Sequence, residues 1–174
     1  MILPKDFDLN EWFIIIWLVI ILAVIFFLPK RFPASITILV FVFCATVGRI
    51  TDRFLAAPWA DFYDVMDTGK YDLFDLLTYI LYALFGYIFI YLYDKIRIKG
   101  LWILLYIVLW SLASVGFEWI SVNVGVFTYK GWIPYLSMSY YLAIQPLTLL
   151  FYSYIIKIYR GNPISNKSVV TFPK

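Results

Sequence analysis

The sequence predicts an all-α polytopic integral membrane protein, with five transmembrane helices in one bundle and no separate soluble domain. Of its 174 residues, 64% are hydrophobic and only 14% are charged, which lies outside the usual composition of soluble globular domains. A hydrocarbon core takes about 20 mainly apolar helical residues to cross, and five windows meet this requirement. These windows lie at about residues 12–28, 33–50, 74–93, 101–123 and 133–156.

The first window has the features of a retained span. Signal peptides start with basic residues and end at a small-residue cleavage site. Here residues 5–11 carry one lysine against three acidic side chains, and the window ends at the sequence LPKR (28–31). The turn at 29–33 is so short that the first two spans should form an antiparallel hairpin.

Residues 51–71 form the longest connection. Its aromatic side chains alternate with Asp61, Asp64 and Asp67, a pattern that favours a short helix lying at the outer membrane interface. A lid folded over the bundle is compatible with the same pattern. Residues 161–174 should form a disordered cytoplasmic tail, since they combine Pro, Asn and Ser with few apolar residues.

Spans three, four and five each carry polar side chains at helical spacing on one face, so these faces should meet inside the bundle. The stripes are Asp72, Asp75, Tyr79, Tyr82 and Gly86 in span three; Ser111, Ser114, Glu118 and Ser121 in span four; and Tyr141, Gln145, Thr148 and Tyr152 in span five.

Basic residues at the span ends predict the orientation. Nine lysines and arginines follow spans one, three and five, whereas five lie on the opposite side. Because cytoplasmic loops carry the excess of Lys and Arg, we expect the N-terminus outside and the C-terminus in the cytoplasm.

Glu118 is the residue that a purely apolar span would not contain. A carboxylate at membrane depth is costly unless it is paired, protonated or open to water. At a rise of about 1.5 Å per residue, Glu118 and Arg49 reach the same level in the outer leaflet, and Asp75 enters span three nearby. The candidate site is therefore an outward-facing charged cluster of Glu118, Arg49, Asp75, Asp72 and Arg53.

Two interpretations of this cluster stay open. In the first, arginine–carboxylate pairs only hold helices two, three and four in register. In the second, the cluster lines a cavity open to the outside and binds a cation, a proton or a lipid headgroup. Tyr79, Tyr82, Gln145 and Thr148 would then line a path into the bundle.

Other kinds of site find little support. The chain has no histidine and one cysteine, Cys44, which excludes His- or thiolate-ligated zinc, haem held by His, and Ser-His-Asp or Cys-His triads. No cofactor and no nucleic-acid partner is predicted. Asp61, Asp64 and Asp67 could hold Mg²⁺ or Ca²⁺ as in lipid-processing membrane enzymes, but a second aspartate motif is missing.

Residues 61–75 (DFYDVMDTGKYDLFD) and 117–134 (FEWISVNVGVFTYKGWIP) resemble landmarks of an uncharacterised family of small five-helix membrane proteins from spore-forming Gram-positive bacteria. The second landmark is a glutamate in span four, here Glu118, followed by Gly125, Tyr129, Gly131 and Trp132. We expect Gly125 to end span four. The resemblance implies a bacterial plasma membrane or sporulation membrane and adds no mechanism.

The leading functional hypothesis is a non-enzymatic membrane component, structural, accessory or sensory, that works with the bilayer and with membrane partners or as an oligomer. The first alternative is a proton- or cation-coupled transporter that uses Glu118. The second is a metal-dependent lipid-modifying enzyme that uses the aspartates.

Overall fold

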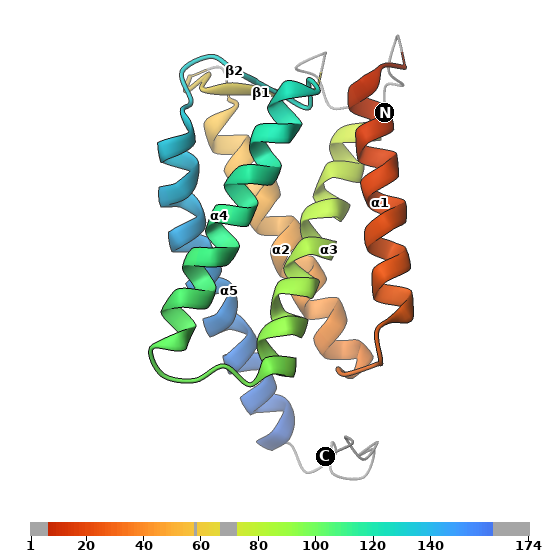
Figure 1. The fold of residues 1–174 in the computed structure, drawn as a ribbon, viewed down its shortest axis with the longest axis vertical. Helices are drawn as coiled ribbons and strands as arrows, with labels where there is room; N and C mark the ends of the chain where they lie inside the picture. Colours follow the sequence, from red (N-terminus) through yellow and green to blue (C-terminus); the bar gives the residue numbers. More distant parts are fainter. Residues whose placement is uncertain (1–6, 58, 67–72, 162–174) are drawn as a thin grey trace.

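The computed structural model describes residues 7–57, 59–66 and 73–161, which form five helices and two short strands (Figure 1). Each helix is long and apolar enough to cross a membrane, which confirms the coarse prediction. The helices are α1 (Leu9–Phe27), α2 (Ala34–Leu55), α3 (Leu73–Ile96), α4 (Trp102–Asn123) and α5 (Pro134–Gly161), and the strands are β1 (Tyr63–Val65) and β2 (Phe127–Tyr129).

The helix ends follow local sequence signals. At the start of α1, the backbone N–H of Asp8 donates to Oε2 of Glu11 (2.7 Å), so the third helical residue reaches back over the first turn. Past the end of α4, Gly125 adopts a φ of 83°, as expected of a glycine that stops a helix. The expected tail falls almost entirely outside the described residues, which end at Gly161.

The five helices alternate in direction, so the bundle has two distinct ends. We call the end that carries β1 and β2 the sheet end, and the opposite end, where α2 and α4 begin, the far end (Figure 1). α2 packs against α3 and α4 packs against α5, while α1 lies against α3. The bundle therefore consists of two helix pairs with α1 added on the side of α3.

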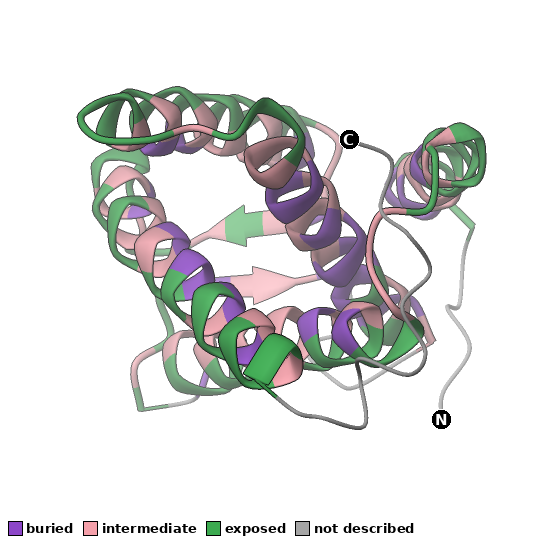
Figure 2. Cartoon of the chain, turned by 90° about the horizontal axis from the view of Figure 1, so that it is seen from below, coloured by how far each residue is buried: buried purple, intermediate pink, exposed green. Residues whose placement is uncertain are grey.

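The prediction of a separate helix within residues 51–71 is wrong for the part that the structure describes. Residues 51–55 continue α2, and Tyr63–Val65 pairs with Phe127–Tyr129 as an antiparallel sheet. The carbonyl of Phe62 accepts the backbone N–H groups of residues 130–132 at 2.9–3.1 Å, so the backbone groups of this connection are satisfied by pairing across the chain. Seen from the far end, the strands lie across the opposite end of the bundle (Figure 2).

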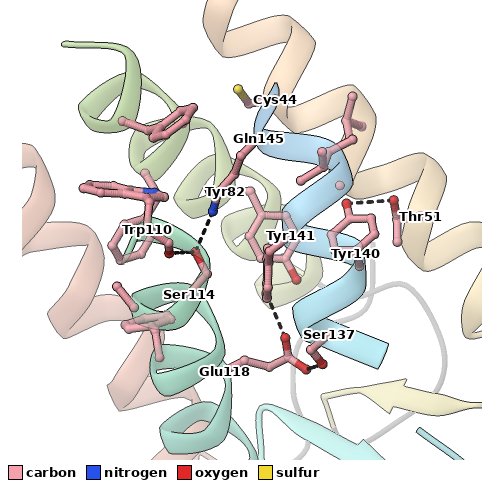
Figure 3. Close-up of a pocket in the computed structure, with 18 of the residues that line it drawn as sticks. Cys44, Thr51, Tyr82, Trp110, Ser114, Glu118, Ser137, Tyr140, Tyr141 and Gln145 are labelled. Carbon is pink, nitrogen blue, oxygen red and sulfur yellow. Dashed lines mark hydrogen bonds between the residues drawn. The ribbon is translucent and has the colours of Figure 1, made fainter. Parts of the chain in front are cut away.

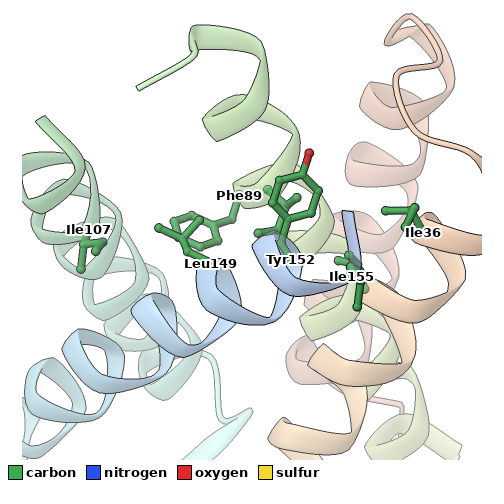
Figure 4. Packing of buried hydrophobic residues seen from close by; sticks show 8 residues of the cluster. Ile36, Phe89, Ile107, Leu149, Tyr152 and Ile155 are labelled. Atoms are coloured by element: carbon green, nitrogen blue, oxygen red, sulfur yellow. The ribbon is translucent and has the colours of Figure 1, made fainter. Parts of the chain in front are cut away.

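One of the two hydrophobic cores among the described residues fills the far end, and the other lies mainly between α1 and α3. Arg31, in the turn after α1, pairs with the carboxylate of Asp94 and also donates to its carbonyl (3.1 Å). Tyr152 of α5 donates to the same carboxylate (2.9 Å), so one aspartate joins three segments. The buried side chains of this far-end core are Ile36, Val40, Phe89, Ile90, Ile107, Leu149, Tyr152 and Ile155 (Figure 4).

Large aromatic side chains separate the two helix pairs. The rings of Phe89 on α3 and Tyr106 on α4 stack with centroids 5.2 Å apart, and the Tyr106 hydroxyl donates to the Phe89 carbonyl (2.6 Å). Nearer the sheet end, Phe85 and Phe117 meet at 4.8 Å. Because rings rather than small residues bridge α3 and α4, these helices are held apart, and space remains between the two pairs.

Candidate functional site

A cavity of about 420 Å³ lies between the two helix pairs, and all five helices and both strands contribute to its wall (Figure 3). Phe89 belongs both to the wall and to the far-end core, so that core forms the floor. The strands form the roof at the sheet end. Most of the wall is apolar or aromatic, and its polar side chains are Thr51, Asp52, Tyr63, Tyr82, Ser114, Glu118, Tyr129, Ser137, Tyr140, Tyr141, Gln145 and Thr148.

Glu118 is the best-connected polar group of this wall. Its Oε1 accepts the hydroxyls of Tyr129 and Ser137, the latter at 2.5 Å, and its Oε2 accepts the hydroxyl of Tyr141 (2.8 Å). Trp132 donates its indole N–H to Ser137 (2.7 Å), which turns the Ser137 proton towards the carboxylate. Glu118 thus ties α4 to β2 through Tyr129 and to α5 through Ser137 and Tyr141; Figure 3 shows the two contacts with α5.

Gln145 forms a second polar contact between α4 and α5, deeper in the bundle. Ser111 donates to its Oε1 at 3.1 Å. Rotation of the amide by half a turn would let its nitrogen donate to the Ile107 carbonyl (2.8 Å) and to Ser111 Oγ (3.1 Å). Ser111 is a partner in both orientations, and in the first the Gln145 amide nitrogen also donates to Ser114 Oγ (3.4 Å; Figure 3). Gln145 borders the same cavity as Glu118.

Asp52, which sequence reasoning did not single out as a site residue, reaches the cavity from α2. Its Oδ1 accepts the Tyr63 hydroxyl (2.7 Å), while its Oδ2 is buried without a hydrogen-bond partner. Tyr63 lies directly opposite Tyr129 in the sheet. In this cross-strand pair, the Tyr63 hydroxyl donates to Asp52 of α2 and the Tyr129 hydroxyl donates to Glu118 of α4.

Both phenols act as permanent donors. Burial raises the pKa of Tyr63 well above its usual range, and the charge of Asp52 adds to the effect. Burial also raises the pKa of Tyr129, with a further contribution from its hydrogen bond to Glu118. The two hydroxyls stay protonated at physiological pH, so the sheet remains bonded to both carboxylates.

The structure does not bring Arg49 to Glu118, so the expected ion pair between them is not formed. Arg49 donates to the Tyr79 hydroxyl (3.0 Å) and lies over the Tyr79 ring. With Arg53 it lines a separate surface hollow on another face of α2. Counting residues considers only the position of a side chain along its helix, whereas the rotation of each helix about its axis turned these two side chains to different sides.

The remaining predicted residues divide between the cavity and other places. Tyr82, Gln145 and Thr148 line the cavity with Glu118, whereas Tyr79 does not. Asp75 is buried in the first turn of α3, away from the cavity wall. Asp72 lies outside the described residues.

The aspartates proposed for a metal have another partner. The Lys130 ammonium binds Asp61 at 2.7 Å and Asp64 at 3.0 Å, and these hydrogen bonds raise the pKa of Lys130. Asp67 lies outside the described residues. Within the part of the chain that the structure describes, no group of three His, Cys, Asp or Glu side chains could hold a metal ion.

Comparison with known proteins gives no match: neither a family model, nor a curated protein, nor a solved structure is significantly similar to this chain. Its function therefore has to be inferred from the geometry of the site.

Proposed function

We propose that this chain is a non-enzymatic integral membrane protein, a sensory or accessory component, that binds a small amphipathic molecule in the cavity between its helix pairs. The observation that carries the proposal is the cavity itself. Its volume of about 420 Å³ falls within the range of small-molecule sites, roughly 300–1,000 Å³.

A bundle with a purely structural role would fill this space with side chains. An unfilled space between packed helices forgoes the dispersion contacts that side chains would make there, and the wall of this cavity carries polar side chains beside its rings. The unfilled space therefore favours a binding role over a purely structural one.

The wall also has the composition of a ligand site. Binding pockets are mostly apolar, with a few polar groups that fix the orientation of the ligand. Here the polar groups gather at two levels, around Glu118 below the roof and around Gln145 deeper in the bundle. An amphipathic molecule would place its polar group near Glu118 and its apolar part against the rings.

Energy transfer from tryptophan to N-phenyl-1-naphthylamine, an uncharged aromatic fluorophore, tests this proposal. Trp17, Trp110 and Trp132 line the cavity, so a bound probe should show saturable transfer above the background of empty micelles. Ser114→Phe fills the cavity from α4 and should abolish saturable transfer. Gly116→Phe is the matched control, since a Cβ at Gly116 would meet no atom within 4 Å. If wild type shows no saturable transfer, or if Ser114→Phe retains it, the cavity is not a binding site.

A second candidate, a proton- or cation-coupled transporter, is favoured by one observation: a single cavity is bordered by both Glu118 and Gln145. Liposomes that contain the protein and a trapped pH dye should then show proton movement when a potassium diffusion potential is imposed. Glu118→Gln should abolish this movement. Equal rates in wild type, Glu118→Gln and protein-free liposomes would eliminate the transporter.

The setting that we propose is the plasma membrane or a sporulation membrane of a bacterium, with the N-terminus outside and the C-terminus in the cytoplasm. The excess of lysine and arginine that follows spans one, three and five supports this orientation. Partners, or a second copy of the chain, would bind largely within the bilayer. A reporter enzyme that is active only outside the cytoplasm should be inactive when it is fused after α5. Activity of this fusion would contradict the proposed orientation.

A further inference from the structure

The charged groups of the cavity wall have one sign. Glu118 approaches from α4 and Asp52 from α2, so each helix pair contributes a carboxylate. Among the described residues that line the cavity, none is a lysine or an arginine. A ligand in this cavity therefore meets negative charge that the wall itself does not neutralise.

The basic side chains that the structure describes at the sheet end do not line the cavity, although Arg49 lies near enough to Asp52 to attract its carboxylate. Arg49 and Arg53 lie together on another face of α2, beside Ile50 and Phe54, and Arg49 donates to a tyrosine of α3. Lys130 is engaged by two aspartates of the segment that contains β1. None of these three cations lines the cavity.

Asp52 shows most directly what the cavity lacks. The residue is only 8% exposed, and its Oδ2 has no hydrogen-bond partner, although buried polar atoms are almost always satisfied. A buried carboxylate oxygen without a donor is costly. Oδ2 is fully buried and has no surface open to the cavity, so a positively charged ligand group beside the Asp52 side chain would offset part of this cost through space.

The wall around the carboxylates is rich in aromatic rings. A cation within about 6 Å of a ring face is attracted by the ring quadrupole, most strongly when water is excluded. Quaternary ammonium groups are recognised by such aromatic surroundings. The rings that line the cavity include Trp17, Tyr82, Phe85, Trp110, Phe117, Tyr140 and Tyr141.

We propose that the ligand is a lipophilic organic cation, with its positive charge beside Glu118 and Asp52 and its apolar body against the rings; this inference rests on the binding function proposed above. A bare Mg²⁺ or Ca²⁺ suits the site poorly, because these ions take about six or more oxygen ligands and most of the wall is apolar. An anion would meet both carboxylates without a counter-charge.

Tetraphenylphosphonium and tetraphenylborate, which share one shape and carry opposite charges, test the inference. Binding to the purified full chain is measured by equilibrium dialysis, with empty micelles of the same detergent as the partition control. Tetraphenylphosphonium should bind saturably and at least tenfold more tightly than tetraphenylborate. Glu118→Gln and Asp52→Asn should each weaken tetraphenylphosphonium binding at least tenfold. Asp61→Asn is the control, because that exposed carboxylate binds Lys130 and does not line the cavity; its affinity should stay within twofold of wild type.

The possible outcomes distinguish this inference from the binding function on which it rests. Equal binding of the two ions, tighter binding of the borate, or wild-type affinity in both carboxylate variants overturns the charge preference. Binding of the neutral fluorophore but of neither ion does the same and leaves the binding function in place. Binding of none of the three probes overturns both. Should a variant fail to fold, the comparison of the two ions on the wild-type chain still decides.

Discussion

The stability of the bundle should depend on Glu118 through its hydroxyl partners and not through Arg49. The carboxylate accepts three hydroxyl hydrogen bonds, from Tyr129, Ser137 and Tyr141. Hydrogen bonds between helices in membrane proteins contribute about 0.6 kcal/mol on average and up to about 1.7 kcal/mol. Because Glu118→Leu removes the acceptor of all three hydroxyls, it should lower the free energy of unfolding by about 2–4 kcal/mol.

Glu118→Gln should lower the free energy of unfolding by no more than about 1 kcal/mol. The amide oxygen can take the place of Oε1, which accepts two of the three hydroxyls. The amide nitrogen can donate to the Tyr141 hydroxyl, which then reverses its role from donor to acceptor. Leucine and glutamine have similar sizes, so a larger loss of stability with leucine than with glutamine would be due to the hydrogen bonds and not to the shape of the side chain.

Two double-mutant cycles complete the test. Glu118→Leu and Tyr141→Phe should be coupled by about 1 kcal/mol, because each change removes the same hydrogen bond. Glu118→Leu and Arg49→Leu should be additive within about 0.5 kcal/mol. The assay is reversible unfolding in mixed micelles with increasing SDS, followed by tryptophan fluorescence. A coupling above about 1 kcal/mol for the Arg49 cycle, or none for the Tyr141 cycle, would refute the reasoning.

Three further substitutions can be measured with the same unfolding titration. Gly86→Ala should cost about 1–3 kcal/mol, because a Cβ there would lie 2.3 Å from Sγ and 2.9 Å from Cβ of Cys44 on the facing helix; a wild-type value would mean that α2 and α3 do not approach this closely. Gly125→Ala should cost about 1–2 kcal/mol, since its φ is 83°, and Gly125→Asn should cost less; equal costs would argue against a left-handed backbone. Tyr63→Phe should cost about 1–3 kcal/mol, because Asp52 then loses its hydroxyl donor; a neutral result would indicate that water replaces the hydroxyl.

Hydropathy predicted the five helices well, because each is a long apolar run and more polar segments separate the runs. The predicted ends lie within about five residues of the observed ones, the largest difference being at Leu55 and Gly161. The stop of α4 at Gly125 was predicted correctly, because a glycine just after the last helical turn is a local sequence signal. In the structure this glycine has the positive φ that such a stop requires. The positions of the helices and of the α4 stop, which depend on residues close together in the chain, could thus be predicted from the sequence.

The features that the sequence did not reveal depend on long-range pairing. Each strand has only three residues, and their partners lie more than 60 positions apart, so no local pattern indicated the sheet. Glu118 lies in the cavity wall, but its partners come from the segment after α4 and from α5 instead of α2. Periodicity showed which side chains share a helix face, whereas the packing of neighbouring helices decided which way each face turned.

The order of synthesis gives the partners of Glu118 a further significance. When α4 leaves the ribosome and enters the proposed membrane, Tyr129 follows within 11 residues, but Ser137 and Tyr141 arrive only with α5. Until then a carboxylate in a membrane-spanning helix has one of its three donors, and such a group is costly in lipid. A nascent chain that stops before α5 therefore holds an incompletely satisfied fourth helix. Entry of α5 supplies the last two donors together with one wall of the cavity, so the same step satisfies Glu118 and closes the proposed binding site.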